Sequence, residues 1–156
     1  MAASSPDLTA SVSAPLPAAL LRYLAALLLF GVGAVHLYEY FADHYRVIPV
    51  IGNLFLANFA GSVALGLALA APLGSLRLVR SLPLVGRAPH AFVALGGIGF
   101  LLGTIIGLII SEQATLFGFH EYGYRATVWL ALGLESAAVV VLAGFLALEG
   151  RRARTP

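Results

Sequence analysis

Long apolar runs alternate with short polar segments along the chain. Four of the runs are each about as long as the roughly 20 helical residues that cross a hydrocarbon core. They cover residues 18–41, 50–71, 91–111 and 126–148. The pattern predicts a single all-α domain over residues 18–150, an integral membrane bundle of four transmembrane helices in contact with the lipid bilayer.

Composition supports a membrane protein and removes several kinds of chemistry. Only 10% of the residues are charged, whereas about a quarter are charged in soluble proteins. The chain has no Cys, which excludes disulfides, thiolate metal sites and a Cys nucleophile. The sequence also contains no G-x-S-x-G, Walker or H-E-x-x-H motif, so it gives no support to hydrolase or nucleotide chemistry.

Basic residues predict the orientation of the bundle in the membrane. The segment between the second and third runs carries three Arg residues and no acid, and further Arg residues flank the two termini. The opposite side holds only Arg46 and Arg125 together with acids. By the positive-inside rule we expect a multi-pass protein of the plasma membrane with both termini cytoplasmic. Because the basic residues follow topology, we expect no nucleic-acid partner.

The segments outside the bundle are short. Residues 1–17 are rich in Ala, Ser and Pro and carry one charge, so we expect a disordered cytoplasmic tail. Residues 151–156 are expected to form a basic cytoplasmic tail. The first run lacks the basic start and cleavage site of a signal peptide and should be retained as a helix. Pro49 is expected in the first turn of the second helix.

Polar side chains within the predicted helices collect in one half of the membrane. At about 1.5 Å per helical residue, His36 and Asn53 lie within roughly 8 Å of the outer surface. Asn58, Thr104 and Glu135 lie roughly 10–14 Å below it, and the inner half has almost nothing polar. The sequence therefore predicts a polar pocket on the extracytoplasmic side. The predicted ligand-binding residues are His36, Glu39, Asn53, Asn58, Thr104, His120, Glu121 and Glu135.

Glu135 is the sharpest single residue, because an acid this deep costs at least ~2.5 kcal/mol on insertion scales and usually faces a cavity or a partner. One interpretation makes it a proton or cation acceptor, or the acidic ligand of a bound molecule. The other makes it a structural hydrogen bond to Asn58 or Thr104 that ties two helices together. Both interpretations place the side chain inside the bundle.

A metal or a haem is an alternative use of the same residues. His36 and Glu39 share one helical face, and His120 and Glu121 lie in the outer loop, so the four could supply nitrogen and oxygen ligands to a divalent metal. His36 and His120 are also the only plausible pair to hold a haem from the same side. Their spacing is not specific for either cofactor.

Two further features concern packing. Gly99, Gly103 and Gly107 form a doubled G-x-x-x-G, which lets another helix approach closely. We expect this face to pack within the bundle, against a membrane-protein partner, or against a second copy of the chain. The segment 112–125 is rich in aromatic residues, which favour the membrane interface, where it can form a lid over the bundle.

Residues 45–58, YRVIPVIGNLFLAN, together with residues 115–121, TLFGFHE, resemble an uncharacterised family of small four-helix membrane proteins from GC-rich Gram-positive bacteria. The resemblance implies the four-span arrangement and no activity. We therefore predict a non-enzymatic membrane protein with an extracytoplasmic pocket, either an accessory subunit or a small component that binds or transports a ligand or ion. The alternative is a membrane redox protein that binds haem or metal through His36 and His120.

Overall fold

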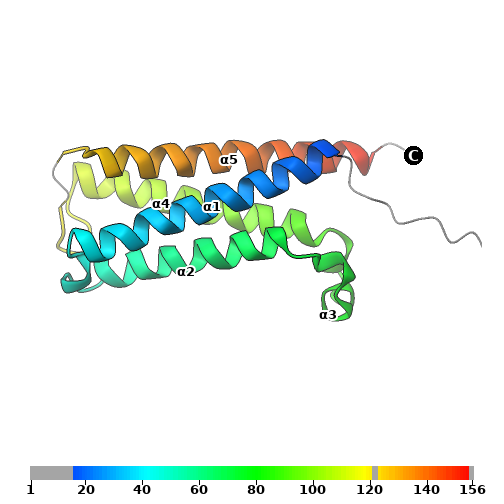
Figure 1. Cartoon of the computed structure of the whole chain (residues 1–156), viewed down its shortest axis with the longest axis horizontal. Helices are drawn as coiled ribbons and strands as arrows, with labels where there is room; N and C mark the ends of the chain where they lie inside the picture. The colour runs from blue at the N-terminus through cyan, green and yellow to red at the C-terminus, as the bar shows by residue number, and fades with distance from the viewer. Residues whose placement is uncertain (1–15, 121–122, 155–156) are drawn as a thin grey trace, which may run out of the picture.

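The computed structural model describes residues 16–120 and 123–154 of the chain. This part holds four long helices, α1 (Leu16–Ala42), α2 (Ile51–Ala70), α4 (Pro89–Gln113) and α5 (Ala126–Arg152). Successive long helices run in opposite directions (Figure 1). Each is long and apolar enough to cross a membrane, with mean hydropathy between 1.6 and 2.4. The predicted all-α four-helix bundle is confirmed, and its helices are those expected of a multi-pass membrane protein.

Short helical turns connect the long helices. They are η1 (Tyr45–Val47), η2 (Leu73–Ser75), α3 (Arg77–Arg80) and η3 (Val85–Arg87). The prediction that Pro49 begins the second helix is wrong, because η1 occupies this connection and α2 starts at Ile51, after a Val50 with φ of 66°.

The first and last helices, α1 and α5, extend into the segments predicted as tails. α1 begins at Leu16, so Pro17 lies in its first turn, where its missing N–H leaves no helical bond unmade. α5 continues to Arg152, and Arg151 and Arg152 lie in its last turn, where they interact favourably with the helix dipole. The rest of the predicted N-terminal tail, residues 1–15, and residues 155–156 lie outside the described part of the chain.

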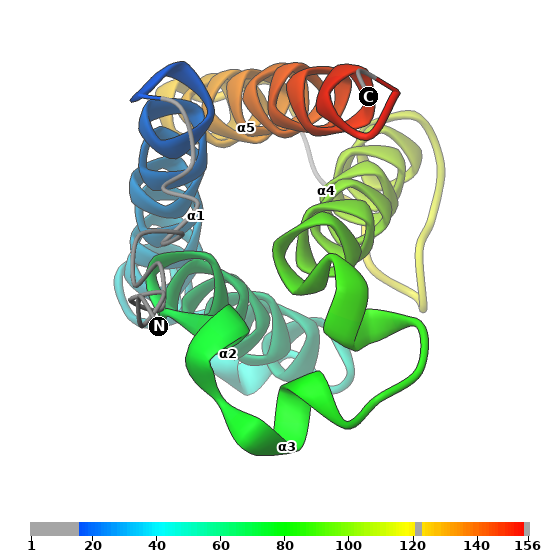
Figure 2. The ribbon, with the colours of Figure 1, turned by 90° about the vertical axis from the view of Figure 1, so that its right-hand side faces the viewer.

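The four helices form a ring in which one seam is loose. Viewed along the bundle, α1 lies between α2 and α5, and α5 lies beside α4 (Figure 2). Contacts are extensive between α1 and α2, between α1 and α5 and between α4 and α5, but they are sparse between α2 and α4. The bundle is therefore closely packed on three sides, whereas the fourth side has fewer contacts, among them Phe100 of α4 against Gly61 of α2.

The apolar core is built from all four helices. Leu29, Leu69, Leu101 and Leu142, one from each helix, are completely buried. The cluster around them lies mainly toward the end where α1 begins and α5 ends, while Tyr45, Ile51, Val128 and Ala131 are buried toward the opposite end. Since lipid is as apolar as leucine, this core is stabilised by close van der Waals packing rather than by removal of apolar surface from water.

Small residues bring α1 and α2 together. A Cβ added to Gly33 would meet the Cβ of Ser62 at 3.3 Å and the carbonyl oxygen of Phe59 at 3.4 Å. One added to Gly66 would meet the Phe30 ring at 2.7 Å. These glycines, and not the G-x-x-x-G of α4, allow the close approach of α1 and α2.

The predicted role of the α4 glycines in packing within the bundle is wrong. A Cβ added to Gly99, Gly103 or Gly107 would meet no atom within 4 Å. The physical reason is that Gly99 is exposed on the outside of α4, while Gly103 and Gly107 border a cavity. Their use by a partner helix or a second copy of the chain stays a prediction.

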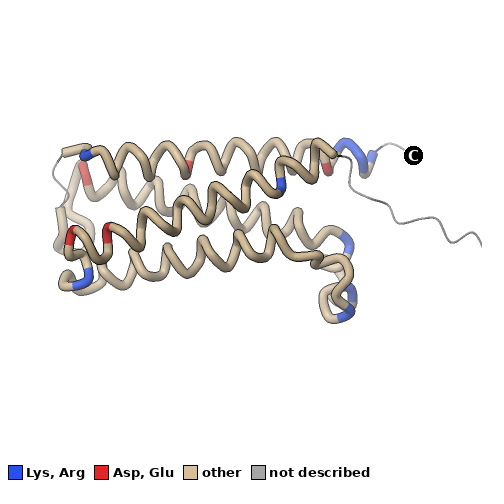
Figure 3. Tube along the Cα trace, in the orientation of Figure 1, with Lys and Arg blue, Asp and Glu red and all other residues tan. Residues whose placement is uncertain are grey.

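Charge divides the two ends of the bundle (Figure 3). We call the end where α1 begins and α5 ends the basic end, because it carries the Arg residues of α3, η3 and the last turn of α5. There Arg22 Nη1 lies 2.7 Å from His90 Nε2, which joins α1 to α4. We call the opposite end, where acids gather with Arg46 and Arg125, the cavity end.

Candidate functional site

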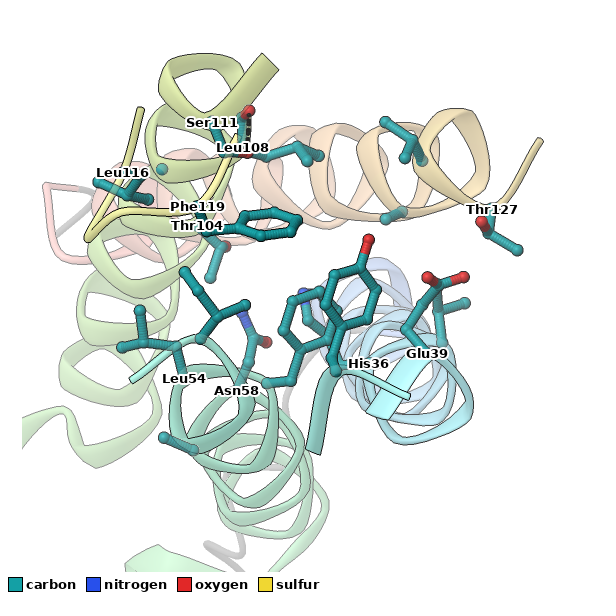
Figure 4. A pocket seen from close by; sticks show the side chains of 18 of the residues that line it. His36, Glu39, Leu54, Asn58, Thr104, Leu108, Ser111, Leu116, Phe119 and Thr127 are labelled. Carbon is teal, nitrogen blue, oxygen red and sulfur yellow. Dashed lines mark hydrogen bonds between the residues drawn. The ribbon is translucent and has the colours of Figure 1, made fainter. Parts of the chain in front are cut away.

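A cavity of about 340 Å³ lies between the helices at the cavity end. All four long helices, η1 and the loop before α5 contribute to its walls, which are mainly aliphatic and aromatic. Figure 4 shows Asn58 of α2, Thr104 of α4 and Phe119 of the loop pointing toward the same space. The polar side chains that line it are His36, Glu39, Asn58, Thr104, Ser111, Arg125 and Thr127.

The orientation of His36 is fixed by its own helix. Its Nδ1 lies 2.9 Å from the carbonyl oxygen of Val32, and because a carbonyl can only accept, Nδ1 carries the proton. In the neutral ring Nε2 is then an acceptor, and it faces Oε1 of Glu135 at 3.7 Å. The ring also lies against Phe55, with centroids 5.4 Å apart. His36 thus connects the cavity wall to the acid behind it.

Glu135 lies behind the cavity wall. It is 1% exposed, and its Oε2 has no hydrogen-bond partner among the residues that the structure describes. The side chain of Asn58 instead accepts a hydrogen bond from Ser62 on its own helix. Thr104 adjoins the carboxyl but donates to the carbonyl of Leu101 at 2.8 Å. The contact with Thr104 is in line with the predicted tie from Glu135 to α4, whereas the predicted tie to Asn58 of α2 is not seen among the described residues.

Replacing Glu135 with Gln is expected to leave the free energy of unfolding unchanged or to raise it by about 1 kcal/mol. A buried carboxyl oxygen without a partner costs stability, and the amide fills the same volume while its N–H can donate to His36. Thermal unfolding in detergent measures the effect, with Glu149→Gln at the basic end as the control. A clear loss of stability in the Glu135 variant alone would show that the acid holds the bundle together.

Arg125 connects the ends of α1 and α5. Its Nη1 donates to Asp43 at 2.6 Å, and its Nη2 donates to Glu39 at 3.1 Å and to the Tyr45 hydroxyl at 2.7 Å. The Glu39 side chain is 6% exposed, whereas those of Asp43 and Arg125 are 35% and 38% exposed. Thr127 lies beside the Glu39 carboxyl. One guanidinium thus serves two carboxyl groups, one of them buried.

The same contacts act on the titration of Asp43. Hydrogen bonds with the Glu39 carboxyl and with the Arg125 guanidinium hold the pKa of Asp43 below its usual range. A lowered pKa in the folded state stabilises the protein above the pKa of an unfolded Asp. This contribution is lost as the pH falls through the lowered value.

Tyr45 closes the cavity from the η1 side. It is 5% exposed, stacks on Phe55 with centroids 4.4 Å apart, and meets Phe119 edge-on at 5.6 Å. Its hydroxyl accepts from Arg125. A buried Tyr is favourable when its ring packs in an apolar wall and its hydroxyl has a hydrogen-bond partner, as here. Tyr45 therefore links the aromatic wall of the cavity to the ion pairs.

The loop before α5 forms a tight hairpin over the cavity. Leu116 and Phe119 exchange two backbone hydrogen bonds, of 2.7 and 2.9 Å. Phe117 and Gly118 between them have φ of 50° and 81°, as a two-residue hairpin turn requires. Leu116 and Phe119 line the cavity, while Phe117 is 65% exposed. The hairpin thus lies at the position predicted for a lid. Its movement as a lid stays a prediction.

The structure brings together only part of the predicted site. His36, Glu39, Asn58 and Thr104 line the cavity, and Glu135 adjoins it through His36. Asn53 is exposed and does not line the cavity, so its placement in the pocket is wrong. The reason is helical rotation: Asn53 is two residues from the lining residue Ile51, about half a turn round the helix.

The loop residues of the predicted site are placed differently. His120 is half-buried but is not among the lining residues, and Glu121 lies outside the described part of the chain. Among the described residues, no three of His, Asp and Glu gather in a way that could hold a metal ion. The cavity also places no second imidazole beside His36. The proposed use of these residues for metal or haem thus finds no support in the described geometry.

Sequence reasoning missed Arg125 and Tyr45 as site residues. A signal for Arg125 was present: it is one of two basic residues on the acidic side of the membrane, in the same layer as Asp43. A basic residue in a position that the positive-inside rule disfavours points to a local acidic partner.

Comparison with known proteins adds no further assignment. No family model, curated protein or solved structure matches this chain. The chemistry and shape of the cavity are therefore the basis on which a function is proposed.

Proposed function

We propose that this protein binds a small, largely apolar molecule bearing a hydrogen-bonding group, and that it acts as a ligand-binding or transport component of the membrane. The observation that carries the proposal is the cavity of about 340 Å³ lined by all four helices. Its volume lies at the lower end of the roughly 300–1,000 Å³ typical of ligand pockets. Mostly apolar walls with a few polar groups are also typical of such pockets.

The polar groups are suited to orient a ligand rather than to perform a reaction. Asn58 and Thr104 offer hydrogen bonds on the walls from α2 and α4, and Glu39 with Arg125 offers charge near the ends of α1 and α5. The described lining residues place no hydroxyl in hydrogen-bond contact with His36. Binding without catalysis is therefore the function that the lining supports best.

The orientation follows from the charges of the two ends. With the basic end on the cytoplasmic side, as the positive-inside rule favours, the cavity lies in the extracytoplasmic half of the plasma membrane. Both termini are then cytoplasmic. A ligand would be taken from the outer leaflet or from the outer surface.

The loose seam between α2 and α4 offers a path from the lipid. These two helices make the sparsest contacts of any neighbouring pair of long helices. Gly103 and Gly107 border the cavity on this side, and neither has an atom near its absent side chain. An apolar ligand can pass such a seam without first entering water, since glycine leaves the helix surface bare.

Replacing Gly103 with Leu is expected to abolish binding, because the new side chain occupies the cavity, and to leave folding intact, because its Cβ meets no atom. The measurement is the saturable uptake of 2-naphthylmethanol and 2-naphthylmethylamine by protein in nanodiscs, with empty nanodiscs subtracted. The matched control is Gly99→Leu, which lies one turn away, has the same free space and does not line the cavity.

The proposal requires saturable uptake of at least one probe in the wild type and in Gly99→Leu, and a loss of about tenfold or more in Gly103→Leu. It is contradicted if neither probe binds above empty nanodiscs. Equal uptake by the two glycine variants also contradicts it.

A further inference from the structure

We infer that the ligand of this cavity is an apolar amine bound in its ammonium form, with its nitrogen donating to the carboxyl of Glu39. The inference rests on the proposed function and names the ligand class of the same cavity. Three independent features carry it: the balance of charges at the cavity end, a buried carboxyl oxygen without a partner, and aromatic walls.

The charged groups around Glu39 lack one positive charge. Glu39 and Asp43 both contact Arg125, at 3.1 and 2.6 Å. Water and His44 also act on Asp43, which is 35% exposed, but the buried Glu39 has only its share of the guanidinium, so a proton in the empty cavity or a cation in the filled one would stabilise it. Apart from His36, which faces a further acid in Glu135, Arg125 is the only basic residue among the described residues that line the cavity.

Glu39 has an acceptor available for such a cation. Arg125 donates to its Oε2, and Thr127 and Asp43 adjoin the carboxyl, whereas Oε1 is buried and meets the geometry of no hydrogen bond among the described residues. The side chain is 6% exposed and lines the cavity. A carboxylate oxygen left without a donor in a buried position is costly, and an ammonium group, which has only donors, satisfies it with a charge-assisted bond.

The walls suit an organic cation better than a metal ion. Tyr45, Phe55 and Phe119 line the cavity, and the faces of such rings attract ammonium groups while the rings also pack against hydrocarbon. Among the described residues no metal-binding group of His, Asp and Glu is present. A single carboxyl in an aromatic and aliphatic cavity matches a ligand with one charged nitrogen and an apolar body.

The test compares two ligands of nearly equal shape on the wild-type protein in nanodiscs. At neutral pH 2-naphthylmethylamine carries an ammonium group, whereas 2-naphthylmethanol carries a neutral hydroxyl. We expect the saturable binding of the amine to be on the order of tenfold tighter or more, because hydrogen bonds to charged groups are the stronger ones. Binding of the alcohol as tight as that of the amine overturns the inference and leaves the proposed function standing. Binding of neither overturns both.

Variants test whether Glu39 is the source of the preference for the amine. Glu39→Gln is expected to bind both ligands with similar affinity, since it keeps the size of the side chain and loses its charge. Asp43→Asn removes the other carboxylate that shares Arg125 but does not line the cavity, so it should weaken the preference for the amine less than Glu39→Gln does, because Oε1 of Glu39 stays available. If the Gln variant fails to fold, Glu39→Asp serves as a second variant. It keeps the negative charge and should therefore keep the preference for the amine. An amine preference that survives in Glu39→Gln overturns the inference.

Discussion

Arg125→Gln is expected to lower the free energy of unfolding by about 2 kcal/mol. Removing one partner of a buried ion pair costs about 3–5 kcal/mol, because the other charge is left buried without compensation. The cost is smaller here since the Arg125 side chain is 38% exposed and water can reach it. Glu39 and Tyr45 would lose their shared donor together, and α1 would lose its main polar contact with the start of α5.

Thermal unfolding in detergent measures this loss. Arg46→Gln is the matched control, because Arg46 is also a basic residue of the cavity end but is exposed. It should change stability by no more than about 0.5 kcal/mol, as surface substitutions usually do. Equal stabilities of the two variants would show that the Arg125 contacts contribute nothing to the fold.

Gly52→Ala is expected to destabilise the protein by about 2–3 kcal/mol, a typical upper cost for overpacking. The added Cβ would lie 2.6 Å from the carbonyl oxygen of Tyr45 and 3.1 Å from the Cα of Arg46. Both are backbone atoms, so neither can rotate away, and α2 must separate from η1. Tyr45 would then shift from its place between Phe55 and the hairpin, and ligand binding should fall in parallel.

Gly96→Ala provides the comparison for this variant. Gly96 lies within α4, and a Cβ there would meet no atom within 4 Å. Since Ala favours a helix over Gly by about 1 kcal/mol, this variant should be as stable as the wild type or more so. If both alanine variants unfold at the same temperature, the close contact between η1 and α2 does not limit the fold.

The sequence by itself determined the four spans and the level of the polar groups. Apolar runs of this length admit only helices in a membrane, because every backbone group must be bonded within the segment. Counting along those helices placed His36, Asn58, Thr104 and Glu135 in the outer half of the membrane, and three of them line the cavity.

Only the tertiary structure decided which side chains face one another. It turned Asn53 to the outside, set Glu135 behind His36, and brought Arg125 to Glu39 across 86 positions in sequence. It also left Gly103 and Gly107 of α4 at the cavity rather than against another helix. The physical reason is that the helices are apolar on almost every side. A helix that is apolar all round has no polar face to indicate which side turns inward. Its rotation is set by packing against its neighbours, here by Gly33 and Gly66 between α1 and α2, which the apolar pattern does not reveal.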